Sequence, residues 1–149
     1  MNKQQLRKLI RETLIYLGLH STEAENLIMG TIAQESKLGH YIEQIKGPAM
    51  GICQMEPETY EDIWRNYLDH KSDLKNKILM ISVDANEADE MRWNLKLSIA
   101  MCRVHYLRDP QPIPLTLLGQ ACYWKRCYNT YKGKGTVDEY LDNYNLLVG

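Results

Sequence analysis

Glu35 is the residue of this sequence whose surroundings point most directly to chemistry. At 100° per residue, Ala24, Ile28 and Ile32 fall within about 60° of Glu35 on a helix, so its carboxyl group continues an apolar stripe. Apolar walls disfavour the charged form of a carboxyl group, and the dipole at a helix C-terminus does the same. Both effects predict a raised pKa, as a general acid near neutral pH requires. The alternative is a helix that ends earlier and leaves Glu35 in solvent.

The other chemistry-bearing residues form none of the common metal or nucleophile patterns. The histidines are scattered, the cysteines contain no C-x-x-C pair, and neither a Ser-His-Asp arrangement nor a Gly-rich phosphate loop is present. We therefore expect no metal and no cofactor, and we expect the cysteines to be free, buried thiols. The residues concerned are His20, His40, His70, His105, Cys53, Cys102, Cys122 and Cys127.

Length and charge narrow the class of protein further. The chain has 149 residues, which corresponds to about one domain. Its 18 basic and 19 acidic residues give a net charge of −1, without the basic excess of a general nucleic-acid binder. No apolar stretch is long enough to span a membrane, and the charged N-terminal segment lacks the apolar core of a signal peptide. We expect synthesis in the cytoplasm, no nucleic-acid partner and no stable membrane insertion.

Hydrophobic periodicity predicts an almost entirely helical single domain over residues 1–149. Apolar residues at helical spacing predict a first helix over Lys3–Leu17, which Gly18 ends. Thr22 with Glu25 matches a capping box for a second helix that runs to about Glu35. Residues 70–90 are ambiguous, and any strand is confined to 36–55. Further helices are expected over 57–68, 88–108, 115–127 and 136–147, with a basic loop over 128–135.

The short sequence motifs around Glu35 resemble the signature of the soluble lytic transglycosylases, enzymes that cleave peptidoglycan. That family carries Glu-Ser, then Gly-Leu-Met-Gln, then a proline and a threonine. Glu35-Ser36 matches the Glu-Ser motif. Four residues match the second motif and the proline and threonine after it, in order and spacing: Gly51, Gln54, Pro57 and Thr59. Three later stretches, at Asn94, Tyr106-Leu107-Arg108 and Tyr128-Asn129, are similar to later motifs of the family. Those motifs are Asn-Ile, Tyr-Leu-Arg and Tyr-Asn. The resemblance covers about residues 20 to 133.

This resemblance implies an all-α, lysozyme-like fold, with at most a minimal hairpin and about six to eight helices around one core beside a substrate cleft. The chain departs from the family at Thr130-Tyr131, where Ala-Gly is usual, and at Glu56, where a hydrophobic residue is common. A short chain without a leader is similar to bacteriophage endolysins and virion-carried muralytic proteins. Such proteins are made in the host cytoplasm and reach the periplasm and cell wall through a holin pore or with the virion.

The resemblance also implies a reaction. Glu35 protonates the glycosidic oxygen of a β-1,4 bond between N-acetylmuramic acid and N-acetylglucosamine, and the muramic acid 6-hydroxyl then attacks C1 to give a 1,6-anhydro end. The alternative is hydrolysis, as in goose-type lysozymes, which needs a second carboxylate to activate a water. Glu43, Glu56 and Glu58 are the candidates, and Glu43 is favoured because it lies closest to Glu35 in the loop region.

The remaining candidate residues each allow a structural alternative. Gln54 and Asn129 are expected to bind the sugar, although either amide could only stabilise a turn. Tyr128 is expected to bind the sugar or Glu35, or else to pack in the core. Ser36 is expected to cap or orient Glu35 and to touch substrate, the alternative being a bare helix C-terminus. Met50 and Ile52 are expected to line the cleft or to join the core. Tyr123 and Trp124 could stack on a sugar but are more typical of a core.

Two functions of other classes remain open at this stage. The first is a virion structural or glycan-binding protein that keeps the fold without turnover, and the second is a helical interaction module with accidental motif matches. The presence of Glu35, Gln54 and Tyr128 together favours the enzyme, because a glycan binder has no need of a buried, protonated acid.

Overall fold

The computed structural model describes residues 1–149 as seven α-helices and three short helical segments, with no β-strand. The expectation of an all-α chain is therefore confirmed, and the expected hairpin is reduced to two isolated bridges, Glu43–Met50 and Met50–Met55. The elements are α1 (Lys3–Leu17), α2 (Thr22–Ser36), α3 (Pro57–Asn66), η1 (Leu68–His70), α4 (Ser72–Ile81), η2 (Ala88–Arg92), α5 (Leu95–Leu107), α6 (Leu117–Trp124), the π-helical η3 (Lys125–Asn129) and α7 (Val137–Leu147). None of these helices combines the length and apolarity that crossing a membrane requires.

The helix ends follow local sequence signals where a capping residue is present. Gly18 ends α1 with a left-handed backbone at φ 73°, as predicted. Asn94 begins α5 by accepting the Leu97 N–H, so the helix expected over 88–108 is instead the short η2 followed by α5. Helix α4 lies in the stretch that sequence left ambiguous, because only Ile78 of this helix is buried and its apolar stripe is narrow.

Glu25 does not serve the capping box predicted for it. Ser21 caps α2 by accepting the Ala24 N–H. The Glu25 carboxylate instead receives hydrogen bonds from Arg7 and Arg11 of α1 and lies 2.9 Å from His20 Nε2. These partners hold the pKa of Glu25 at about 2 in spite of its burial. The carboxylate therefore ties α1 to α2, the helix that carries Glu35.

Replacing Glu25 with Gln is expected to lower the free energy of unfolding at pH 7 by about 2 kcal/mol. The loss stays below that of a wholly buried pair because the Arg11 side chain is 52% exposed. Since the folded-state pKa lies below the ordinary value of 4.5, the stabilisation is complete above that value and disappears as pH falls toward 2. Urea unfolding at pH 7 and pH 3 checks this, and equal differences between the two proteins at both values would contradict it.

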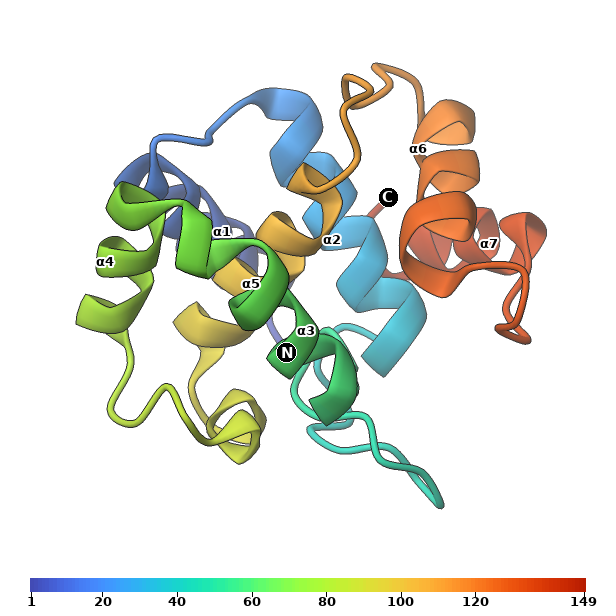
Figure 1. Cartoon of the computed structure of the whole chain (residues 1–149). Coiled ribbons are helices and arrows are strands. Elements are labelled where there is room, and N and C mark those ends of the chain that lie inside the picture. The colour runs from blue at the N-terminus through green and yellow to red at the C-terminus, as the bar shows by residue number, and fades with distance from the viewer.

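Helix α5 has two apolar faces, and this divides the interior into two clusters instead of the single core expected. Ile99, Cys102 and Tyr106 belong to a cluster with α1, α2, α6 and α7. Leu97, Met101 and Val104 belong to a second cluster with α3, η1, α4 and η2. In Figure 1, α5 accordingly runs behind α3 through the middle of the molecule, with α4 on the left and α6 and α7 on the right. Glu35, one residue before the end of α2, lies where the chain leaves the first cluster for the loop that leads to the second.

Candidate active site

The Glu35 carboxyl group is half-buried, and its single hydrogen-bond partner is a tryptophan. The Trp124 Nε1–H of α6 donates to Glu35 Oε2 over 3.0 Å. Burial raises the Glu35 pKa to about 7, and the donated hydrogen bond opposes this increase. No charged side chain contributes to the shift. Glu35 is therefore about half-protonated at pH 7, and its pKa is raised in the direction that its position on the helix predicted.

Tyr128 lies beside Glu35 but bonds to the backbone of the neighbouring loop. Its hydroxyl donates to the Cys53 carbonyl over 2.6 Å, and its ring stacks on Tyr106 at 5.3 Å. Burial raises its pKa, and the nearby Glu35 charge adds to the increase. Tyr128 thus joins η3 to the loop that contains Gln54, and it makes no direct bond to the Glu35 carboxyl group.

Gln54 lies in the same loop, and the nitrogen of its side-chain amide is already hydrogen-bonded. Its Nε2 donates to the Gly51 carbonyl over 2.9 Å, and its backbone is held at φ 49°. The side chain is half-buried, and its Oε1 is left free to accept a hydrogen bond. Gln54 therefore closes the turn, as the structural alternative proposed, and it keeps an acceptor for a ligand. Met50 is also half-buried and pairs with Glu43 and Met55 through backbone bridges.

Two residues expected to touch substrate instead have structural roles. Ser36 is buried, donates to the Ile32 carbonyl over 3.1 Å and accepts the Gly39 N–H over 2.9 Å. Its hydroxyl caps the end of α2, one of the roles expected for it, and it neither reaches the surface nor bonds Glu35. Ile52 is fully buried in the first core cluster. The motif position is apolar because it packs in that core, and it does not line a binding surface.

Asn129 and Glu43 differ from their expected roles in another way. Asn129 accepts a hydrogen bond from Lys125 Nζ over 2.6 Å, so its amide is part of the loop after η3. Glu43 is exposed, and its charge acts on the pKa of Arg92 and not on that of Glu35. The Glu35 charge thus acts on Tyr128 and on Cys53, the neighbour of Gln54 in the chain, whereas the exposed Glu43 contributes nothing to the Glu35 pKa.

Trp124 is the site residue whose role the sequence did not predict. Its ring is fully buried against Tyr140, so it forms no stacking platform for a sugar, and Tyr123 is also buried. One general rule could have indicated this role from the sequence, namely that a buried indole N–H needs a hydrogen-bond acceptor. His105 was also missed. It packs edge-on against Tyr128 at 5.1 Å, with a pKa that burial lowers to about 4 and a buried Nδ1 without a hydrogen-bond partner.

Burial and the nearby Cys102 thiol raise the pKa of Cys53, and the Glu35 charge adds to this increase, so this thiol lies near the acid. All four cysteines are free, but only Cys53 and Cys102 are buried, whereas Cys122 is exposed.

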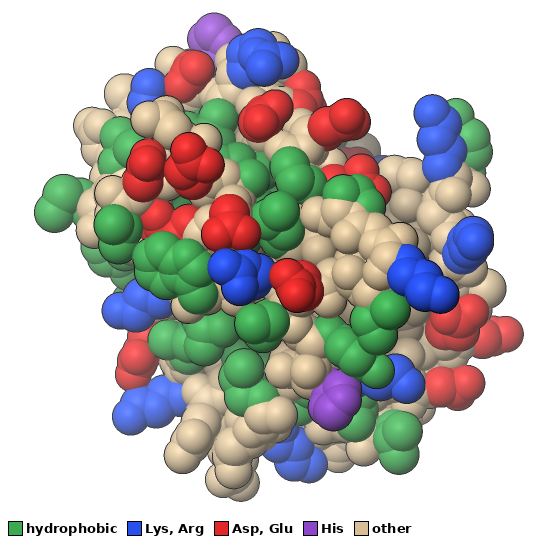
Figure 2. Space-filling model, turned by 90° about the horizontal axis from the view of Figure 1, so that it is seen from below, with side chains coloured by type: hydrophobic (Ala, Val, Ile, Leu, Met, Phe, Trp, Pro, Cys, Tyr) green, Lys and Arg blue, Asp and Glu red, His purple; other side chains and the backbone are tan.

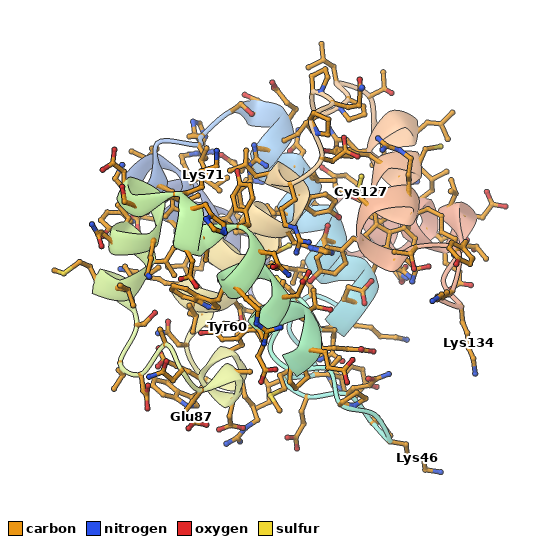
Figure 3. The ribbon with its side chains drawn as sticks, viewed as in Figure 1. Lys46, Tyr60, Lys71, Glu87, Cys127 and Lys134 are labelled. Atoms are coloured by element: carbon orange, nitrogen blue, oxygen red, sulfur yellow. The ribbon has the colours of Figure 1, made fainter.

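A hollow of about 260 Å³ lies between α3 and α4, lined by Tyr60, Trp64 and Lys75 among others. A smaller one is lined by Lys3, Arg7 and Val148 among others. Neither contains Glu35, and Figure 3 shows Tyr60 on the α4 side of α3, away from α6. Figure 2 shows the molecule from below, with a hollow at its upper right between the body and a projecting segment that carries a basic side chain.

Replacing Trp124 with Phe is expected to keep an aromatic ring at this buried position and to remove the hydrogen bond to Glu35. Because that bond lowers the Glu35 pKa, its loss raises the pKa further. A general acid is active when protonated, so the alkaline limb of the pH–activity profile should move to higher pH, with a roughly tenfold lower maximum from lost orientation. Initial lysis rates between pH 5 and 9 measure both effects, and an unmoved alkaline limb would contradict the assignment.

Comparison with known proteins finds no relative of this chain. No protein-family model, no curated protein and no solved structure matches the chain. The functional interpretation therefore rests on the residues and contacts described above.

Proposed function

We propose that the protein is a peptidoglycan-cleaving enzyme, a lytic transglycosylase of phage type with a lysozyme-like fold and a glycan cleft at the end of α2. The observation that carries the proposal is the solitary Glu35 carboxyl group, held by Trp124 with a pKa of about 7. A carboxylic acid whose pKa lies near 7 is suited to donate a proton to a leaving oxygen at neutral pH. The sequence motifs that contain Glu35 and Gln54, matched in order and spacing, support a glycosidic bond as the target of this acid.

In the proposed reaction, Glu35 gives its proton to the glycosidic oxygen as the bond to muramic acid C1 breaks. Positive charge develops at C1, and the muramic acid 6-hydroxyl attacks that carbon. The Glu35 carboxylate then accepts the hydroxyl proton, so the enzyme returns to its starting state and no water is consumed. Because the nucleophile belongs to the substrate, positioning replaces a second catalytic group.

Glu43, Glu56 and Glu58, the candidates for a second carboxylate, are all exposed, and none contributes to the Glu35 pKa, which favours this reaction over hydrolysis. An inverting hydrolase needs a carboxylate about 6.5–9.5 Å from the acid to activate water. Glu43 was the leading candidate, yet it is exposed and does not influence the Glu35 pKa. Gln54 lies on the loop to which Tyr128 is hydrogen-bonded, and its free Oε1 is suited to accept a hydrogen bond from a sugar hydroxyl or acetamido group.

Mass spectrometry of the fragments released from purified sacculi tests the proposal. A transglycosylase gives 1,6-anhydromuramic ends, which are lighter by one water than hydrolytic ends. We expect anhydro ends from the wild type and from Glu43→Gln at similar rates. Reducing ends, lost in Glu43→Gln, would instead establish hydrolysis with Glu43 as the base. Release of no fragment by a folded protein would favour the second candidate, a glycan-binding virion protein.

A further inference from the structure

The loop that follows η3 is folded around one ammonium group. Lys125 Nζ donates to Asn129 Oδ1 over 2.6 Å, to the Gly133 carbonyl over 3.0 Å and to the Gly135 carbonyl over 2.7 Å. These bonds use all three protons of the ammonium group. The Thr130 N–H also donates to the Lys125 carbonyl over 2.7 Å, and Thr130 is held at φ 66°, a conformation that a β-branched residue rarely adopts. The loop over residues 130–135 therefore has one defined shape.

This loop rests directly on the candidate active site. A side chain at Gly135 would lie 2.7 Å from the Trp124 ring and 3.2 Å from the Gln34 amide, so the Gly135 backbone packs against both. Trp124 binds the Glu35 carboxyl group, and Gln34 precedes Glu35 on α2. The base of the loop is thus fixed beside the proposed acid, and its tip extends outward. Figure 3 shows Lys134 at the outer end of the loop, pointing away from α6 and α7.

The tip of the loop is basic and has no acidic partner. Residues 125–135 contain four cations and no Asp or Glu. Arg126 is paired with Asp109, and Lys125 is used inside the loop. Lys132 and Lys134 remain, both exposed and outside every ion pair of the structure. Tyr131, 88% exposed, lies beside them, with Lys132 Nζ 5.9 Å from its ring centroid.

We infer that the 130–135 loop is a substrate-recognition arm that binds the carboxylates of peptidoglycan stem peptides while the glycan strand passes Glu35. This inference rests on the proposed function. The N-acetylated sugars of the strand are neutral apart from the muramic lactyl group, whose carboxylate is bound in an amide wherever a peptide is attached. Free carboxylates on an intact strand therefore lie on the peptides. Two unpaired ammonium groups on a fixed loop beside the acid are complementary to them.

The test compares two substrates with one set of variants. The substrates are intact Gram-negative sacculi and the same glycan strands after an amidase has removed their peptides and a carbodiimide with a neutral amine has converted the lactyl carboxylates that the amidase frees into amides. The variants are Lys132→Met/Lys134→Met and, as a control with the same change of charge, Lys8→Met/Lys96→Met, whose two lysines lie on α1 and α5. Lys125→Met leaves the tip lysines in place and removes the group around which the loop folds.

On intact sacculi, Lys132→Met/Lys134→Met should raise KM about five- to tenfold at low salt with kcat unchanged, the size expected for two exposed ion pairs. It should act like the wild type on stripped strands, and the control should act like the wild type on both. Lys125→Met should lose the same preference for intact sacculi. An equal effect on the two substrates, no effect on either, or an effect that appears only with phosphate-bearing wall polymers would overturn the inference. Failure of the wild type to cleave even stripped strands would instead contradict the proposed function.

Discussion

Glu35→Gln is expected to reduce lysis of permeabilised Gram-negative cells about a thousandfold, within the range that a positioned general acid contributes. Gln has nearly the same shape as protonated Glu and still accepts the Trp124 N–H, but it has no proton to give to the glycosidic oxygen. Turbidity loss measured beside Glu43→Gln gives the comparison. Equal lysis by the wild type and Glu35→Gln would remove Glu35 from the mechanism.

The same variant should be more stable than the wild type at pH 8. The folded-state pKa of Glu35, about 7, lies above the ordinary 4.5. The folded wild type therefore loses stability as pH rises through this interval, whereas Gln does not titrate. We expect a gain of about 2–3 kcal/mol at pH 8 and almost none at pH 4. A variant that lost activity because it misfolded would show the opposite, a loss of stability at both values.

Gly51→Ala is expected to destabilise the protein by about 3 kcal/mol. Gly51 has φ 78°, and an added Cβ would lie 2.4 Å from the Met91 carbonyl oxygen and 2.4 Å from Ser98 Oγ. The Met91 carbonyl belongs to the backbone, so the contact is relieved only by moving η2 or the loop. The Gly51 carbonyl also accepts the bond that closes the Gln54 turn, and we expect activity to fall with stability.

The midpoint of thermal unfolding measures this effect, and about 3 kcal/mol corresponds to a decrease of roughly 6–12 °C for a chain of this size. Gly47→Ala is the matched control from the same loop. The three atoms nearest to an added Cβ there all belong to the Gln44 side chain and none to the backbone, and Gly47 has no positive φ. Moving Gln44 costs the hydrogen bond that its Oε1 accepts from the Ala49 N–H, so the control should lose no more than about 1 kcal/mol. Similar midpoints for the two variants would show that the Gly51 contact is not restrictive.

Local patterns predicted the parts of the fold that depend on local interactions. The apolar stripe and terminal glycine of α1 and the Thr136 cap of α7 were readable, because capping and periodicity act within a few residues. The break before α5 was also encoded in Asn94, but a continuous apolar pattern hid it. The two-cluster interior was not predicted, since it depends on which partners pack on each face of α5.

The candidate site shows the same division. The burial of Glu35 followed from the angular positions of Ala24, Ile28 and Ile32 on one helix. Its bond to Trp124 joins residues 89 positions apart, and no periodicity encodes such a contact. The motif identified Ser36 and Ile52 as special positions but could not separate substrate contact from packing, because both constrain a residue type.

The central claim is that Glu35 remains partly protonated at neutral pH in the folded protein, and a carboxyl titration tests it most directly. Carbon-13 NMR of protein labelled at the glutamate side-chain carboxyl follows each group from pH 3 to 9, and the signal missing from Glu35→Gln assigns this residue. We predict a midpoint near 7. A midpoint near 4, the value of a solvated glutamate, would contradict the account.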